Sequence, residues 1–169
     1  GLDFGIPNGH FYTQANGTAP GADTKGYSIT DDDGIPFWSE FRRLGGVDEL
    51  GYPVSRRFIW AGYVHQVTQK VVMQWRPEVK QVWFANVFDA MSTAGKDGWL
   101  QVVRQTPKAF DTSPDTGRPW SQVADRHWKL LDTNEAIKRR YWADSDPLNH
   151  YGLPMSHAEF SNVFVLRAQ

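Results

Sequence analysis

One short motif occurs twice in this chain of 169 residues, each time in the same surroundings. The motif is Gly-x-Pro-x-Ser, at residues 51–55 and again at residues 152–156. Each copy follows a predicted helix with an Arg-Arg pair near its end, and each precedes a strand-like run that contains Phe58 or Phe160. Glycine permits a sharp turn and proline fixes φ, so both copies are expected to form the same stiff loop. The sequence therefore predicts two diverged helix–loop–strand repeats.

The two copies differ in how much of the unit they contain. Repeat-like unit 1 covers about residues 37–87, and a partial repeat-like unit 2 covers about residues 135–169. We interpret 1–169 as a single domain, because repeated units commonly stack and bury what one unit cannot bury alone. We also expect residues 163–168 to pair within the sheet of repeat-like unit 1. The chain is further expected to be part of a longer polypeptide with additional domains.

The spacing of apolar residues indicates an α+β fold with small antiparallel sheets and short helices. A helix is predicted over 36–44, because Phe37, Phe41 and Leu44 recur at i, i+4 and i+7. Further helices are expected at 89–93 and from about residue 134. Strands are predicted at 10–14, 26–30 and 63–69, and a hairpin at 71–75 against 81–86. Residues 16–26 and about 104–127 are expected to be surface loops. The expected core residues are Phe37, Phe41, Leu44, Phe58 and Tyr141.

Composition excludes several classes of function. The chain has 18 basic and 19 acidic residues, so its net charge of -1 gives no broad attraction for nucleic acid or anionic lipid. No apolar run approaches the roughly 20 residues that cross a bilayer, so membrane insertion is not expected. The absence of cysteine excludes disulfides, thiolate metal sites and a cysteine nucleophile.

No familiar catalytic motif is present, and no cofactor is expected. The sequence lacks a Gly-x-Ser-x-Gly elbow, a Walker loop and a Gly-x-Gly-x-x-Gly turn. His150 and His157 are close in sequence, but the histidines lack zinc-site spacing, and Asp31–Asp33 lacks the spacing of a calcium loop. Carboxylates such as Asp48, Glu49 and Asp89 leave a glycan-active hydrolase open as a third alternative.

The tryptophans suggest a binding surface. Several of the eight tryptophans lie in or beside the β-rich stretch, with glutamines interleaved. Flat aromatic faces can pack on sugar rings while amides bond their hydroxyl groups. The alternative is that these rings form the core. The candidate ligand-binding residues are Trp60, Tyr63, His65, Gln66, Gln69, Gln74, Trp75 and Trp83.

The first copy also resembles a known repeat family. Leu44-Gly45-Gly46, then Leu-Gly-Tyr-Pro-Val-Ser at 50–55, is followed by Phe58, Gly62, Gln69 and Gln74-Trp75. This arrangement resembles the LGFP repeat of bacterial cell-surface proteins. The match covers 37–87 well and 135–169 more loosely, since Leu153 replaces the aromatic residue in the second copy and the small Gly-Gly pair is missing.

The resemblance implies a non-catalytic extracellular or cell-surface module that binds polysaccharide, in particular cell-wall glycan. The alternative function is a structural or protein-interaction domain of an exported protein, in which the repeats stack and the aromatic residues are core.

Overall fold

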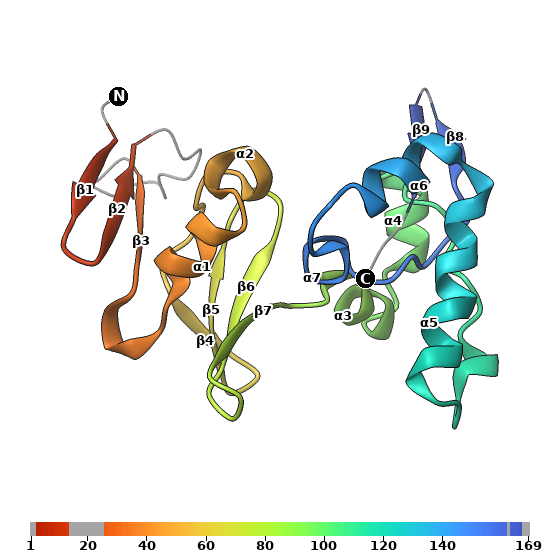
Figure 1. The fold of residues 1–169 in the computed structure, drawn as a ribbon, viewed down its shortest axis with the longest axis horizontal. Helices are drawn as coiled ribbons and strands as arrows, with labels where there is room; N and C mark the ends of the chain where they lie inside the picture. The colour runs from red at the N-terminus through yellow and green to blue at the C-terminus, as the bar shows by residue number, and fades with distance from the viewer. Residues whose placement is uncertain (1–2, 14–25, 162, 167–169) are drawn as a thin grey trace. The chain divides into compact units, whose positions relative to one another are not determined.

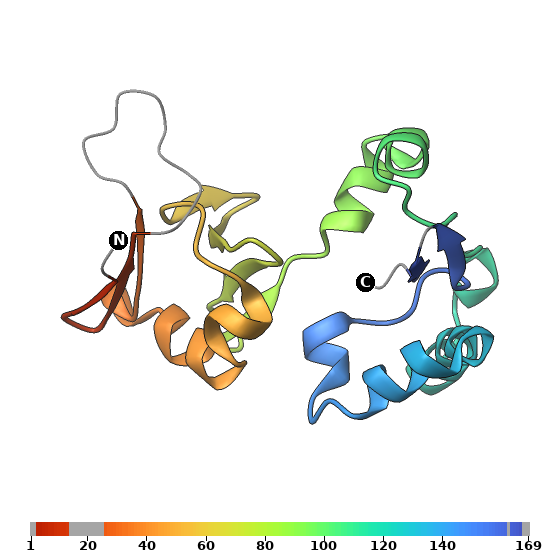
Figure 2. The same ribbon diagram turned by 90° about the horizontal axis from the view of Figure 1, so that it is seen from above.

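The computed structural model describes residues 3–13, 26–161 and 163–166, and it confirms the predicted α+β class. The contacts divide the chain into two compact units, Gly1–Ala85 and Asn86–Gln169 (Figures 1 and 2). This boundary lies beside the predicted end of repeat-like unit 1. That the two units fold as a single domain stays a prediction. In the described ranges, no helix is long and apolar enough to span a bilayer.

Unit 1 contains two antiparallel sheets. The first has the order β1-β2-β3 and the second has the order β4-β5-β6-β7. The strands are β1 (Phe4–Ile6), β2 (Gly9–Tyr12), β3 (Tyr27–Thr30), β4 (Phe58–Trp60), β5 (Tyr63–Val67), β6 (Val72–Arg76) and β7 (Gln81–Phe84). The predicted hairpin is confirmed as β6–β7. Pro77 lies in the connecting turn, where its lack of a backbone N–H breaks no hydrogen bond between the strands.

The helices of unit 1 follow β3 and precede β4 in the chain (Figure 1). They are η1 (Asp32–Gly34), α1 (Phe37–Arg43) and α2 (Gly46–Leu50). Phe37 and Phe41 of α1 are fully buried in one cluster with Leu44, Leu50 and Met73 of β6. The helix stripe read from the sequence is therefore confirmed, because its apolar face is covered on both sides.

The prediction that Phe58 belongs to the core is wrong. Phe58 is 39% exposed, since it lies on the edge strand β4 and faces away from the cluster around Met73. Its cross-strand neighbour is His65, and the two rings stack with centroids 5.6 Å apart.

Unit 2 is mostly helical, with one two-stranded sheet. Its elements are α3 (Val87–Thr93), α4 (Asp97–Val103), η2 (Ser113–Asp115), α5 (Trp120–Trp128), η3 (Lys129–Thr133), α6 (Glu135–Trp142), α7 (Pro147–Tyr151), β8 (Glu159–Ser161) and β9 (Val163–Val165). Asn134 caps α6, because its side chain accepts from the backbone N–H groups of Ala136 and Ile137. Tyr141 is buried, as predicted.

The long loop expected over about 104–127 ends earlier than predicted. Residues 106–118 are mainly exposed, apart from a buried Pro107, but α5 begins at Trp120 directly after Pro119. The buried side of α5 is made by Ala124 and His127 instead of large apolar residues. Trp120, Val123, Ala124, His127 and Trp128 recur at i, i+3, i+4, i+7 and i+8, so the sequence does carry a helical period here. The loop prediction followed the Pro, Asp, Ser and Thr residues that precede α5 and extended them too far. The other loop, 16–26, lies outside the described residues except for Gly26, which is buried.

The two repeats have the same order of elements. In each copy a helix and a short helix are followed by glycine with positive φ, at 75° for Gly51 and 72° for Gly152. The prolines that follow, Pro53 and Pro154, are both buried, and a strand begins seven residues after each glycine. The predicted duplication of helix, loop and strand is therefore confirmed as a structural repeat.

The end of the second copy differs from the prediction. Strand β9 pairs with β8 in a separate two-stranded sheet and, among the described residues, takes no part in the sheet of unit 1. Residues 167–168 of the predicted strand lie outside the described ranges. Because β9 pairs with the adjacent β8 instead, the expected pairing with the first copy is wrong.

Candidate functional site: the outer face of the four-stranded sheet

Two rows of side chains run across one face of the sheet β4–β7. Residues directly opposite each other in antiparallel strands lie on the same face. The first row runs Phe58, His65, Gln74, Trp83 over all four strands. The second consists of the pairs Trp60–Tyr63 and Arg76–Gln81, joined by the Arg76 guanidinium, which lies 4.5 Å from the Tyr63 ring centre. We call these eight residues the outer face.

The outer face presents three large aromatic rings to solvent. Trp60 is 47% exposed, Trp83 is 46% exposed and Phe58 is 39% exposed. The opposite face of the sheet carries Met73, which is fully buried in the core of unit 1. The exposed rings are therefore the solvent side of a sheet whose other side is fixed by packing.

A chain of hydrogen bonds connects the polar members of the outer face. His65 Nδ1 lies 3.0 Å from the carbonyl oxygen of Tyr63, and His65 Nε2 lies 2.9 Å from Gln74 Nε2. Because a carbonyl oxygen only accepts, Nδ1 carries the proton and Nε2 accepts from the Gln74 amide. Gln74 Oε1 then accepts from Arg76 Nη1 at 3.3 Å. In this chain of three side chains, every donor N–H of His65, Gln74 and Arg76 that is named here faces an acceptor.

Arg76 holds two of the rings in place. Its guanidinium lies 4.5 Å from the centre of the Tyr63 ring and 4.9 Å from that of Trp83, and its Nε donates to Glu78 at 2.5 Å. Such contacts between a cation and an aromatic face are attractive. The Trp83 indole N–H also donates to Gln81 at 3.1 Å. The exposed Trp83 ring is thereby held by both Arg76 and Gln81.

His65 should make stability depend on pH. Its side chain is 0% exposed, and burial lowers its pKa from the ordinary value of 6.5. Below pH 6.5 the unfolded chain binds a proton that the folded state resists, so the free energy of unfolding falls as the pH drops from 6.5 towards the lowered pKa. Urea unfolding at several pH values measures how the free energy of unfolding changes with pH. In His65→Gln this change should be smaller, because the contribution of the buried imidazole is gone. An identical slope in both proteins would contradict the assignment.

The structure brings five of the eight sequence-predicted residues together on the outer face: Trp60, Tyr63, His65, Gln74 and Trp83. Gln66 and Trp75 lie on the opposite face, where Gln66 is buried and its amide donates to the carbonyl oxygens of Ser28 and Ser55. Gln69 follows β5, and its Oε1 accepts from the Tyr52 backbone N–H. These three side chains have structural partners within Gly1–Ala85.

Three members of the outer face were not among the predicted binding residues: Phe58, Arg76 and Gln81. Alternation along the strands contained the signal, because residues two apart share a face. Phe58 lies two residues before Trp60 on the same strand, and Arg76 lies two residues after Gln74. Residue type alone, aromatic or amide, does not separate the two faces of the sheet.

Unit 2 contains a buried polar network that ties α5 to the second repeat loop. His127 Nε2 lies 2.9 Å from Asp115 Oδ2, and His127 Nδ1 lies 2.7 Å from the Pro154 carbonyl oxygen. Burial by itself would raise the pKa of Asp115, but hydrogen bonds from His127 and Arg126 hold it below its usual value. Both ring nitrogens of His127 are engaged, so the network positions the loop and offers no ring nitrogen to a substrate.

The other sequence candidates have local partners. Asp31 accepts from the backbone N–H and hydroxyl of Ser39, so it holds the start of α1. His150 bonds to Asp144 at 2.6 Å. Within the described ranges, no group of three or more histidine, aspartate or glutamate residues could hold a metal ion.

Comparison with protein-family models, with curated proteins and with solved structures gives no match to this chain.

Proposed function

We propose that this chain is a non-catalytic extracellular module that binds polysaccharide on the outer face, with cell-wall glycan as the ligand class. The observation that carries the proposal is the set of exposed rings on one sheet face: Phe58 and Trp60 contact the His65 ring, and Trp83 contacts Arg76 and Gln81. Aromatic faces pack on the C–H surfaces of sugars, and nearby amide and guanidinium groups bond the hydroxyls.

The geometry favours a polymer over a single sugar. Trp60 lies on β4 and Trp83 on β7, three strand spacings apart. With neighbouring strands about 4.8 Å apart, the two strands are separated by about 14 Å. A ligand that contacts both rings must extend across the whole sheet, as a chain of sugar units does. The extracellular setting and the cell-wall ligand are supported by the resemblance of the repeat, and the outer face supplies the chemistry.

Removing either exposed tryptophan should weaken the binding of purified insoluble cell-wall glycan. We expect Trp60→Ala and Trp83→Ala each to lower the affinity about tenfold, because losing one aromatic packing contact costs roughly 1.4 kcal/mol. Trp99→Ala is the matched control: Trp99 is also 46% exposed but lies on α4 in unit 2. Co-sedimentation over a range of glycan concentrations measures the effect.

Two outcomes of this experiment would contradict the proposal. Wild-type protein that stays in the supernatant at every glycan concentration would favour the structural or protein-interaction alternative. Equal losses in Trp83→Ala and Trp99→Ala would mean that binding does not use the outer face.

A further inference from the structure

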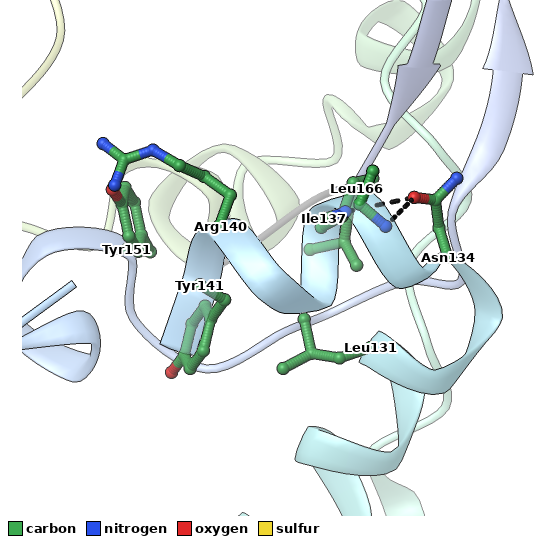
Figure 3. Close-up of a pocket in the computed structure, with 8 residues that line it drawn as sticks. Leu131, Asn134, Ile137, Arg140, Tyr141, Tyr151 and Leu166 are labelled. Atoms are coloured by element: carbon green, nitrogen blue, oxygen red, sulfur yellow. Dashed lines mark hydrogen bonds between the residues drawn. The ribbon is translucent and has the colours of Figure 1, made fainter. Parts of the chain in front are cut away.

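Unit 2 contains an apolar pocket of about 470 Å³ beside α6 (Figure 3). The residues that matter here are Leu131, Ile137, Tyr141, Tyr151 and Leu166. Figure 3 shows Tyr141 and Ile137 on α6, with Leu166 next to Ile137 and Tyr151 at the other end of the pocket. The pocket is independent of the outer face, which belongs to unit 1.

The internal repeat identifies the counterparts of three pocket residues in the first copy. Tyr141 and Leu44 each follow an Arg-Arg pair, and Tyr151 and Leu50 each precede the positive-φ glycine. In the hairpins, Phe160 pairs with Phe164 as Ile59 pairs with Val64. Leu166 is two residues beyond Phe164, so its counterpart is Gln66, two residues beyond Val64.

In the first copy these counterparts share a buried cluster or a strand register with a side chain from the next strand. Gln66 pairs with Met73 of β6, and Met73 is fully buried in the same cluster as Leu44 and Leu50. In the second copy, within the part of the chain that the structure describes, β9 pairs only with β8. The pocket therefore lies where the first copy holds Met73 and the strand that carries it.

We propose that this pocket, with the neighbouring edge of β9, is a docking site for a partner that presents a strand patterned like β6. The partner's backbone would pair with β9, and an apolar side chain in the position of Met73 would enter the pocket between Tyr141, Tyr151 and Leu166. Strand addition at an open edge supplies affinity through main-chain hydrogen bonds, and the pocket for alternate side chains supplies specificity. β6 itself, with Met73 and Trp75 facing the core and Gln74 and Arg76 facing out, defines the pattern.

The test uses the full chain and a synthetic peptide with the sequence of residues 70–77. NMR spectra of the ¹⁵N-labelled protein should show saturable one-to-one binding, with amide shifts at Ile137, Tyr141, Tyr151 and Leu166. A peptide carrying Met73→Asp should bind at least tenfold more weakly, because a carboxylate cannot enter an apolar pocket without losing its hydration. In the protein, Ile137→Glu should cause a similar loss, while Val102→Glu, at an exposed apolar position on α4, should cause none.

Several results would overturn this proposal. These are the absence of saturable binding, equal binding by the Met73→Asp peptide, or amide shifts confined to the sheet edges of unit 1. Concentration-dependent dimers that Ile137→Glu abolishes would instead make a second copy of the chain the occupant. Circular dichroism of Ile137→Glu checks that α6 is retained. None of these readouts depends on glycan binding.

Discussion

Replacing Phe41 by alanine is expected to lower the free energy of unfolding by about 3–5 kcal/mol. Phe41 is fully buried, packs edge-on against Tyr12 with ring centres 6.0 Å apart, and stacks on Trp38 at 6.1 Å. Because the cluster around Phe41 includes residues of both sheets and of α2, the surrounding structure cannot collapse fully into the cavity. Urea unfolding followed by circular dichroism measures the loss.

The control for this substitution is Ile59→Ala. Ile59 is also apolar and belongs to unit 1, but its side chain is largely exposed on the edge strand β4. Its loss should stay below about 1 kcal/mol, as is usual for exposed positions. A loss below about 1 kcal/mol for Phe41→Ala as well would mean that the cluster around α1 does not hold unit 1 together.

Replacing Gly51 by alanine is expected to cost about 3 kcal/mol, at the upper end of the roughly 1–3 kcal/mol of a strained backbone conformation. Gly51 has φ 75° and ψ 175°, a combination that is essentially restricted to glycine. An added Cβ would also lie 2.6 Å from Cβ of Gln69, whose amide oxygen accepts from the Tyr52 N–H. The substitution therefore strains the loop and displaces the side chain that fixes it.

Two further substitutions sharpen this prediction. Gly152→Ala should be destabilising for the same backbone reason, since Gly152 has φ 72° and ψ -169°. Gly98→Ala is the control, because Gly98 lies in α4 with nothing within 4 Å of an added Cβ, and alanine favours a helix. Thermal unfolding of the three variants measures the effect. An unchanged melting temperature in Gly51→Ala would contradict the repeated loop geometry.

The sequence predicted those parts of the fold that local chemistry determines. The buried stripe of α1 and the β6–β7 hairpin have strong periodicity, and Asn134 is an ordinary helix cap. Helix α5 was missed although Trp120, Val123, His127 and Trp128 recur with a helical period. The segment before it is rich in Pro, Asp, Ser and Thr, and the loop predicted there was extended through residue 127. The bonds of His127 to Asp115 and to the Pro154 carbonyl come from other segments and could not be read from the helix itself.

The candidate site was predicted only in part, because residue type alone does not say which face of a sheet a side chain occupies. Trp75 and Trp83 are both in the β6–β7 hairpin, yet Trp75 packs on the core and Trp83 is exposed. The face that each ring occupies follows from the strand register, because paired residues share a face. Trp75 pairs with Val82 on the core face, and Trp83 pairs with Gln74 on the outer face. The role of Arg76 depends on its position between two rings from different strands, which no local pattern contains.

The indole N–H signals of the eight tryptophans test the central claim most directly. In a ¹⁵N-labelled sample titrated with soluble cell-wall glycan fragments, the signals of Trp60 and Trp83 should shift together and saturate at one ligand concentration. The Trp83 signal is a direct reporter, because its N–H already donates to Gln81 on the outer face. The signals of Trp99, Trp120 and Trp142, exposed in unit 2, should not move. Shifts at these three with Trp60 and Trp83 unchanged, or no shift at any indole, would contradict glycan binding by the outer face.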